Sequence, residues 1–352
     1  MLSYVNNLFG GFSETKEIKG EEVVNIANGK DSDYSRIRTD VGIFPMTFIT
    51  YYKIIGDKAE ETLDCLLTKS IQYLNYGQNR MCYFLNCSAE IDAFVTIYKN
   101  DDNFILEVFN WDAHTVENIL SNNNVVIEKL DFKCILLEGV SAIDFITEEL
   151  ELSVDYFVYQ SHQELDCFGK GITVARTGYT GEYGYKLIGE TNSIKYIWGR
   201  ILPKHKSKIV GYAAFEMCQY EIKQPFWELP YLSLSNNIFE IDYHWFVDFK
   251  KDINYIGKDS LYNTKSSDMP KKLIGALSDQ EATIGSDVML DDSVVGTVVD
   301  SRFSYGLQKY ISMLFVDNKY AHANIPLQTT NEFSLTTVSA PYVFPSSWSA
   351  KK

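Results

Sequence analysis

The segment Ala175–Tyr185 is the part of the sequence whose residue types and spacing best suit a chemical site. It reads Ala-Arg-Thr-Gly-Tyr-Thr-Gly-Glu-Tyr-Gly-Tyr, so three glycines and a Thr-Gly-Glu turn stand between two stretches suited to strands. Glycine tolerates the backbone conformations that a tight turn requires. The pattern therefore predicts a tight hairpin with an acidic tip, Glu182, that brings aromatic rings close to backbone.

Elsewhere in the sequence, the reactive side chains do not form a recognisable catalytic or metal-binding motif. The five histidines have no motif that would supply a catalytic partner: His114, His162, His205, His244 and His322. The sequence contains no Gly-x-Ser-x-Gly elbow, no P-loop and no dinucleotide-binding glycine motif. Among the six cysteines there is no Cys-x-x-Cys pair, and Cys82 and Cys87 have no histidine nearby at the spacing of a zinc site. We therefore expect no metal site.

Bulk properties narrow the class of protein. A chain of 352 residues, 45% of them hydrophobic, is long enough for two or three domains. The formal net charge of −15 disfavours nucleic acid and anionic membrane surfaces, because both are bound through clustered Lys and Arg. Most cysteines lie in apolar runs, which is typical of buried thiols in a reducing compartment. With no long apolar stretch and no signal-like start, we expect a cytoplasmic protein.

The elements that would position the hairpin form two similar halves. The polar residues 1–35 suggest a flexible lead-in, and residues 36–265 then contain a loose repeat. In each copy an apolar strand ends in a Gly-x-x-Ala turn that opens a helix, and a hairpin and a strand running into a second helix follow. The corresponding segments are 54–67 with 104–120, and 135–146 with 185–202. Unless this is a coincidence of common patterns, it predicts two ferredoxin-like (split βαβ) units, an α+β arrangement.

A separate C-terminal region, residues 271–352, follows a polar stretch that ends at Pro270. Short apolar runs at 273–277, 294–299 and 310–316 alternate there with turn signals. They predict a small antiparallel β-barrel or sandwich.

Four segments, in order along the chain, resemble motifs of the aminomethyltransferase (glycine-cleavage T-protein) family. Arg176–Glu182 matches that family's Arg-Thr-Gly-Tyr-Thr-Gly-Glu at seven consecutive residues. Phe239–Trp245 resembles its Phe-Glu-x-x-x-x-Trp segment, and Tyr255–Leu261 its Phe-Ile-Gly-Lys-x-x-Leu segment. Val295–Lys309 resembles its C-terminal barrel signature. Because the order is kept from roughly residue 35 to residue 348, a chance similarity is implausible.

The resemblance implies a fold and an activity. The fold would be a duplicated ferredoxin-like folate-binding region followed by a small C-terminal antiparallel β-barrel, with a central channel for tetrahydrofolate. The activity would be transfer of a one-carbon unit between an amine, thioether or ether and tetrahydrofolate. Asp92 is the best match to the family's catalytic aspartate, although one acid of the family's pair is missing, and Tyr179 is the second catalytic candidate. A carboxylate could accept a proton or stabilise positive charge at the transferred carbon, but a solvated aspartate at a strand edge is the alternative.

Several positions that contact the pterin or line the channel in the family carry other residues here. Lys186 stands where the family has an acidic residue, and Phe215-Glu216 stand where it has Arg-Asp. An ammonium group only donates hydrogen bonds, so the pterin N–H groups would lose an acceptor, at a cost of about 1–3 kcal/mol for each lost contact. Trp227 and Trp348 fall near tyrosines of the family's channel and make it more apolar. The cofactor-binding candidates are therefore Glu182, Lys186, Phe215, Glu216, Trp227 and Trp348.

Three functions remain open. The first is a tetrahydrofolate-dependent one-carbon transferase, with a pocket rewired around Lys186 and Glu182 or Glu216. It would act on a small molecule or on a carrier other than the lipoylated H-protein, which is typically acidic and would be repelled by this chain. The second is a repurposed enzyme of the same fold that does not use folate. The third is a non-catalytic ligand-binding or regulatory protein, whose role would survive Asp92→Ala.

Overall fold

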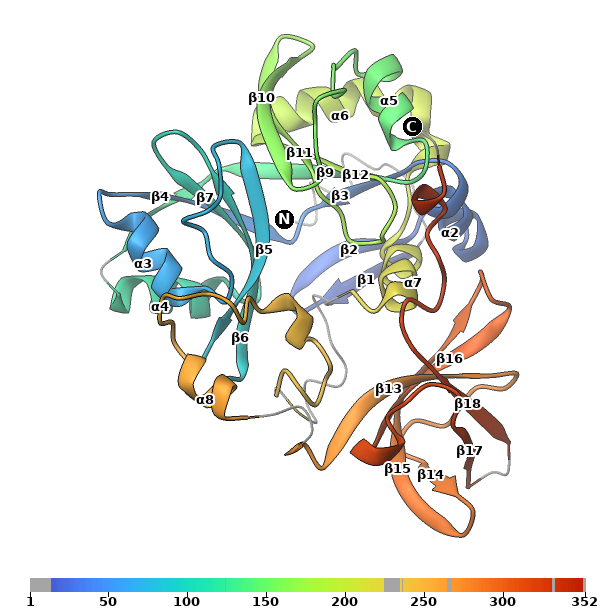
Figure 1. Ribbon diagram of the computed structural model, residues 1–352. Helices are drawn as coiled ribbons and strands as arrows, with labels where there is room; N and C mark the ends of the chain where they lie inside the picture. Colours follow the sequence, from blue (N-terminus) through green and yellow to red (C-terminus); the bar gives the residue numbers. More distant parts are fainter. Residues whose placement is uncertain are drawn as a thin grey trace.

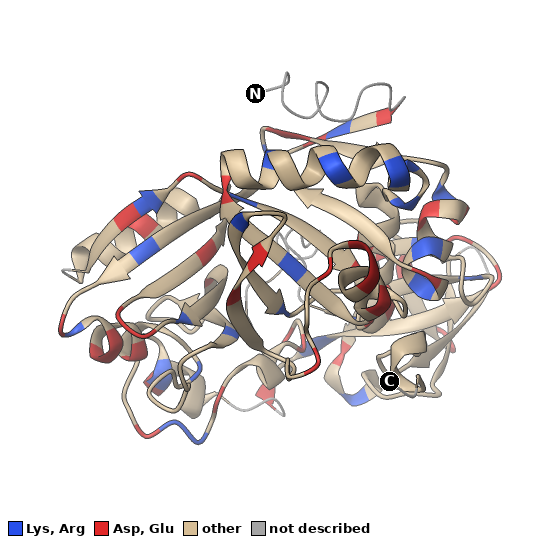
Figure 2. Ribbon diagram, turned by 90° about the horizontal axis from the view of Figure 1, so that it is seen from above, with Lys and Arg blue, Asp and Glu red and all other residues tan. Residues whose placement is uncertain are grey.

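The computed structural model describes residues 14–123, 125–224, 235, 237–264, 268–330 and 333–350 (Figure 1). Its helices are α2 (Lys30–Thr39), α3 (Ala59–Leu66), α4 (Ala113–Asn122), α5 (Ala142–Glu149), α6 (Thr191–His205), α7 (Tyr212–Ile222) and α8 (Lys258–Asn263), with 3-10 turns at η1 (Lys206–Lys208), η3 (His244–Phe246), η5 (Asn318–Tyr320) and η6 (Ser346–Trp348). None of the helices in the described part of the chain is long and apolar enough to cross a membrane. Acidic and basic residues are interspersed along the helices and strands when the ribbon is viewed from above (Figure 2).

A ten-stranded sheet forms the centre of the molecule. In order across the sheet, its strands are β3 (Gly42–Met46), β9 (Phe132–Glu138), β12 (Gly184–Glu190), β11 (Lys170–Arg176), β10 (Ser161–Cys167), β5 (Gln78–Leu85), β6 (Ile91–Lys99), β7 (Phe104–Phe109), β4 (Ile49–Ile55) and β8 (Val126–Leu130). The two halves of the sheet meet at β10 and β5, where Ser161 pairs with Gln78.

Each half has the strand order of a ferredoxin-like unit, which confirms the predicted duplication. In the first half, β4, α3, β6, β7, α4 and β8 come in this order along the chain, with β5 between α3 and β6. Across the sheet the order is β8, β4, β7 and β6. In the second half, β9, β12 and β11 take the same relative places around α5 and α6. The fourth place is filled by β3, which precedes the whole first half in the sequence and pairs with β9. The halves are therefore interlocked.

The alternation of side chains along the strands divides the core into layers. On β6, Ala93, Val95 and Ile97 pack with α3 and α4, whereas Phe94 and Tyr98 on the opposite face join a large central cluster. The second half packs its own outer face against α5 and α6. The inner faces of both halves and α7 meet in the central cluster, so the residues that could form a site lie between the halves.

The C-terminal region is a closed barrel, as the sequence predicts. Around the barrel its strands are β13 (Lys271–Ser278), β16 (Lys309–Asp317), β15 (Ser293–Ser304), β14 (Asp287–Leu290), β17 (Pro326–Thr329) and β18 (Ser334–Val338). Closure pairs every strand, so the barrel has no open edge. Beyond it, η6 returns to the central region of the molecule.

Residues 14–35 differ from the flexible lead-in that their polar composition suggests. β1 (Glu14–Ile18) and β2 (Glu21–Ile26) form a two-stranded antiparallel sheet, and α2 begins at Lys30. Val23 and Val24 are buried, and the Asp33 carboxylate accepts hydrogen bonds from the backbone amides of Ala27 and Asn28. A few apolar contacts and one polar turn therefore order a segment that is polar on average. Residues 1–13 lie outside the described part of the chain.

Candidate functional site

The motif-bearing hairpin lies at the centre of the candidate site. β11 and β12 pair in an antiparallel register, with Thr173 opposite Ile188, and residues 177–183 connect them. Glu138, at the end of β9, accepts hydrogen bonds from the backbone amides of Tyr179 (2.5 Å) and Thr180 (2.9 Å) and from the Thr180 hydroxyl. A Cβ at Gly178 would lie 2.5 Å from Glu138 Oε1, so this close approach requires glycine. Burial raises the pKa of Glu138 to about 7.

Glu182, expected to contact a cofactor, makes its hydrogen bonds within the protein. Its Oε1 accepts from Arg38 Nη1 (3.0 Å) and from the backbone amide of Ser346 (2.9 Å). Its Oε2 accepts from the backbone amide (2.8 Å) and the hydroxyl (2.5 Å) of Ser347. The four hydrogen bonds attach η6 to the hairpin, so this carboxylate holds two distant segments together.

Behind the hairpin lies a buried polar cluster, which we call the Glu107–Lys186 cluster and which also contains Tyr51, Tyr98 and Tyr179. Lys186 Nζ lies 2.6 Å from Glu107 Oε1 and 2.8 Å from the Tyr179 hydroxyl. That hydroxyl donates to Glu107 Oε1 at 2.9 Å. Glu107 Oε2 accepts from the hydroxyls of Tyr98 (2.8 Å) and Tyr51 (3.1 Å). All five side chains are buried, and Lys186 is 0% exposed.

The electrostatics of the Glu107–Lys186 cluster keep its tyrosines protonated. Burial, with the neighbouring Glu107 carboxylate, raises the pKa of Tyr51, Tyr98 and Tyr179 well above the ordinary value. The three hydroxyls therefore stay protonated near neutral pH and donate hydrogen bonds to Glu107. The structure encloses the Tyr179 hydroxyl, an expected catalytic group, between Glu107 and Lys186.

The two neighbouring candidates on α7 point in different directions. Phe215 stacks on Phe44, with ring centroids 5.1 Å apart, and meets the Tyr179 ring edge-on at 6.3 Å. Glu216 instead forms an ion pair with Arg302 of β15 at 3.1 Å. The structure thus brings Phe215, Tyr179 and Lys186 together, and it directs Glu216 to the barrel.

Asp92 lies apart from the Glu107–Lys186 cluster. It stands near the start of β6 and is partly exposed, at an irregularity in the pairing with β5, where Leu85 lies opposite Ile91. Four positions along β6 separate it from Thr96, which lies opposite Glu107 and hydrogen-bonds with the Tyr179 side chain. That corresponds to about 13 Å along a strand. Burial and the nearby Glu90 carboxylate raise the pKa of Asp92. The two expected catalytic residues, Asp92 and Tyr179, are therefore not brought together.

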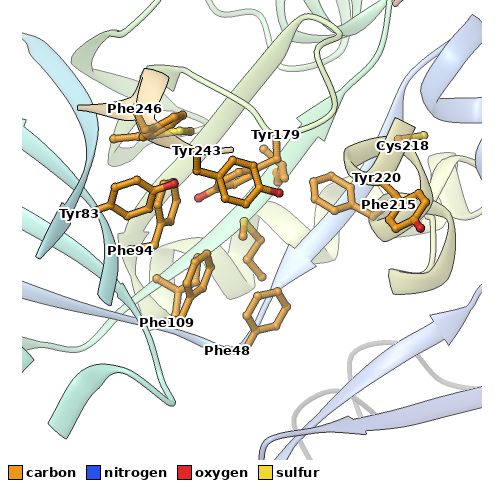
Figure 3. Close-up of a cluster of buried hydrophobic side chains, with 14 of the residues drawn as sticks. Phe48, Tyr83, Phe94, Phe109, Tyr179, Phe215, Cys218, Tyr220, Tyr243 and Phe246 are labelled. Atoms are coloured by element: carbon orange, nitrogen blue, oxygen red, sulfur yellow. The ribbon is translucent and has the colours of Figure 1, made fainter. Parts of the chain in front are cut away.

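Aromatic rings pack around Tyr179 on the inner side of the hairpin (Figure 3). Phe94 stacks on Phe109 with centroids 6.1 Å apart, and Phe109 stacks on Trp111 at 5.1 Å. Phe48 stacks on the same indole ring at 5.6 Å. The figure shows Phe94 and Phe109 on one side of Tyr179 and Phe215 on the other. The inner side of the hairpin is thus bordered by packed rings.

A cavity of about 530 Å³ lies on the other side of the hairpin tip. Its walls include the backbone of Gly178 and Gly181, the Arg176 side chain, and the exposed rings of Tyr159 and Trp348. Trp348 is 60% exposed, but its indole N–H donates to the Gly181 carbonyl at 3.1 Å, which fixes the ring. We call this cavity the hairpin pocket.

The candidate residues differ in where they lie relative to the hairpin pocket. Trp348 lines the hairpin pocket, whereas Asp92 is not among the residues that line it. Trp227 lies outside the described residues. Within the residues that the structure describes, no three His, Cys, Asp or Glu side chains converge in the way that a metal site requires.

Glu107, Glu138, Tyr51 and Tyr98 are residues of the site that the sequence reasoning missed. A usable signal exists for the two acids. Each is a single charge inside an otherwise apolar strand, in Phe-Ile-Leu-Glu-Val-Phe for Glu107 and in Cys-Ile-Leu-Leu-Glu for Glu138. A charge at such a place needs a buried partner. No comparable signal marks Tyr51 and Tyr98, because tyrosine is common in strands.

Comparison with known proteins gives the family of this chain. The sequence family described as "GCVT N-terminal domain" matches residues 11–251. The aminomethyltransferase of Caldanaerobacter subterraneus subsp. tengcongensis is 26% identical over 309 residues, which cover 82% of this chain and 80% of the relative. That of Alkaliphilus oremlandii is 23% identical over 346 residues, covering 92% and 90%. This chain belongs to the aminomethyltransferase (glycine-cleavage T-protein) family, as a divergent member.

A solved structure supports the same fold. The glycine cleavage system aminomethyltransferase T from Bartonella henselae superimposes with a TM-score of 0.85 at 17% sequence identity, covering 98% of this chain and 97% of that one. The family is one of folate-dependent transferases of one-carbon groups, and this chain shares its fold.

The residues present at the family's pterin positions do not fit tetrahydrofolate. A pterin ring presents N–H donors that need a free acceptor, and a carboxylate offers about four acceptor sites. Glu107 and Glu182 each accept four hydrogen bonds from the protein itself, and Glu138 accepts three from the hairpin. Lys186 is a donor, and Phe215 offers no polar atom. The carboxylates around the hairpin are thus engaged within the protein.

Proposed function

We propose that this chain is a one-carbon transferase that acts on a small molecule bound in the hairpin pocket, and that its partner is not the lipoylated H-protein. The pocket carries this proposal. Its volume of about 530 Å³ lies within the range of roughly 300–1,000 Å³ that is typical of small-molecule sites. It adjoins the segment that carries the family's motif.

The chemistry of the walls suggests how a ligand would be held. Trp348 and Tyr159 present flat faces that favour stacking with a planar group. The Arg176 guanidinium lies 5.7 Å from the centroid of the Tyr183 ring, which keeps this cation beside the aromatic walls. A small molecule with a planar part and a negative or acceptor group would match these walls.

The proposal is tested by identifying and then re-binding the ligand. Native mass spectrometry of the purified protein, followed by extraction, would identify a small molecule that co-purifies. Its dissociation constant would then be measured by calorimetry for the wild type and for Trp348→Ala. We expect Trp348→Ala to weaken binding about tenfold, while Tyr196→Ala, which removes an exposed ring on α6, leaves it unchanged. Equal affinities for the wild type and Trp348→Ala would contradict a ligand site in the hairpin pocket.

A non-catalytic ligand-binding protein is the second candidate, and the separation of Asp92 from Tyr179 favours it. The bound molecule would be incubated with the wild type and with Asp92→Asn, and loss or gain of a one-carbon unit would be followed by mass spectrometry. A transferase should change the mass of its ligand by one carbon unit. A binding protein would release the molecule unaltered, and Asp92→Asn would then bind it as the wild type does.

A further inference from the structure

We infer that the Lys186–Glu107 ion pair closes the family's pterin position, so that the carbon carrier or substrate of this chain is not tetrahydrofolate. This inference goes beyond the proposed function, because it concerns the Glu107–Lys186 cluster, none of whose charged side chains lines the hairpin pocket. It starts from the chemistry of the donors and acceptors that the structure places behind the hairpin.

The Glu107 carboxylate has no acceptor site left for a ligand. Lys186 and Tyr179 donate to one of its oxygens, and Tyr98 and Tyr51 donate to the other, at distances between 2.6 and 3.1 Å. Four donors fill the lone-pair sites of a carboxylate. A pterin amino group could bind there only by displacing one of these side chains.

Displacing Lys186 is costly because its ammonium is fully buried. It is 0% exposed and lies 4.4 Å from the centroid of the Tyr179 ring, so water does not reach it. Separating a buried ion pair leaves two uncompensated charges in a medium of low polarity. An arriving pterin would bring N–H donors toward an ammonium, which is itself a donor, so it would not replace the lost interaction.

Phe215 closes the same position from α7. Its ring meets the Tyr179 ring edge-on and stacks on Phe44, and it is 1% exposed. The position thus offers an aromatic ring at the place where the family has a cation. Lys186 places a hydrogen-bond donor where the family has an acceptor. Phe215 places an apolar ring where the family has a polar group.

The positive charge that Lys186 brings to this position is compensated by the negative charge of Glu107. Lys186 stands on β12 and Glu107 on β7, in different halves of the sheet, yet they meet at 2.6 Å. An unpaired lysine at this depth would lose its charge or destabilise the protein. The ion pair with Glu107 and the hydrogen bond to the Tyr179 hydroxyl satisfy Lys186, which is expected of a stable site that does not receive a pterin.

The first test measures the wild type. Tetrahydrofolate is titrated by calorimetry under anaerobic conditions up to about 1 mM, where a family-type site would be saturated. We expect no saturable heat. Saturable binding in that range would overturn the inference, because the ion pair would then not exclude the cofactor.

The second test restores an acceptor. The triple variant Glu107→Gln/Lys186→Glu/Phe215→Arg places the family's residue types at both altered positions and replaces the Glu107 charge by an amide. Its matched control, Glu107→Gln/Lys186→Met/Phe215→Arg, breaks the ion pair without adding a carboxylate. Circular dichroism establishes that both are folded. We expect binding of tetrahydrofolate by the first, about tenfold or more tighter than by the control; equal binding by both would overturn the inference.

The two proposals fail in different ways. If the wild type rejects tetrahydrofolate but Trp348→Ala binds the co-purified ligand as well as the wild type does, the proposed ligand site is wrong and the exclusion of folate stands. If the wild type binds tetrahydrofolate and Trp348→Ala weakens binding of the co-purified ligand, the exclusion of folate is wrong and the proposed ligand site stands. When the triple variants do not fold, Phe215→Arg alone is compared with the wild type, and saturable binding by either protein overturns the inference.

Discussion

At the scale of single residues, Glu107 and Lys186 determine what the centre of this protein can bind. Each would be unfavourable alone, since a buried charge without a partner is destabilising. Together with three tyrosines they form a group in which each Glu107 oxygen has two donors. The motif on the hairpin is intact, but the residue seven positions after Tyr179 has changed the chemistry behind it.

The coupling between these charges can be measured. Lys186→Met should lower the free energy of unfolding by about 3–5 kcal/mol, because it leaves the Glu107 carboxylate buried without its cation. The double variant Lys186→Met/Glu107→Gln should recover most of that loss, since no bare charge remains. Urea unfolding at pH 7, followed by tryptophan fluorescence, would give both values. A double variant that is less stable than Lys186→Met would show that the charges do not depend on each other.

Glu138 predicts a dependence of stability on pH. Its pKa is about 7 in the folded protein, against an ordinary value of 4.5. A raised pKa means that the folded state binds the proton more tightly than the unfolded state. This contribution to stability is therefore fully present below about pH 4.5 and is lost as the pH rises through 7, by about 3 kcal/mol in total. Glu138→Gln should flatten the profile of unfolding free energy between pH 5 and 8, and an unchanged slope would contradict the assignment.

The sequence predicted part of this site. Lys186 and Phe215 were identified as altered pterin positions, and the structure brings both to Tyr179. Their partner Glu107 was not predicted, because 79 positions separate it from Lys186 and no local pattern links them. Asp92 matches a motif position, but a motif does not encode the distance along β6 that separates this residue from the Glu107–Lys186 cluster.

At the scale of elements, two carboxylates hold the hairpin in place. One lies on the neighbouring strand β9 and the other at the tip of the hairpin itself. Glu138 fixes residues 178–180 from β9, and Glu182 attaches η6 to the tip. Predicting the hairpin was straightforward, because its glycines and turn residues are adjacent in sequence. The attachment of η6, which lies more than 160 positions away, depends on tertiary contacts that the sequence does not reveal.

Removal of the Glu182 carboxylate should release η6. Glu182→Ala leaves the amides of Ser346 and Ser347 without their acceptor and removes one of the two carboxylates that pair with Arg38, which keeps Glu221. We therefore expect a loss of about 2–4 kcal/mol in unfolding free energy. Hydrogen exchange at Ser346 and Ser347 should become faster, while the ladder between β11 and β12 stays protected. The control is Glu164→Ala, an exposed acid on β10. Unchanged exchange at both serines would show that other contacts hold η6.

The order of strands in the sheet could also be predicted only in part from the sequence. The duplicated ferredoxin-like pattern was readable because helices and strands alternate locally in both copies. The role of β3 was not, since it joins β9 across a gap that contains the entire first half.

At the scale of the whole molecule, the net charge of −15 bears on the partner. Like charges oppose association, most strongly at low ionic strength. We expect no binding of the lipoylated H-protein by surface plasmon resonance at about 10 µM in 0.15 M salt. The aminomethyltransferase of a glycine cleavage system, measured on the same surface, is the positive control. Binding that strengthens as salt is removed would show complementary patches and would contradict the expectation.

The position of β3 has a consequence for how this protein can be made and divided. Ribosomal synthesis delivers β3 long before β9 exists, so the edge strand of the second half must wait until more than 90 further residues have emerged. No single cut of the chain yields two complete sheets, because a cut after the first half also removes a strand from the second. A fragment starting at Asp131, after β8, would expose the edge of β9, and such an unpaired edge invites association with other chains. Splitting this protein for complementation therefore requires that residues 42–46 travel with the C-terminal piece.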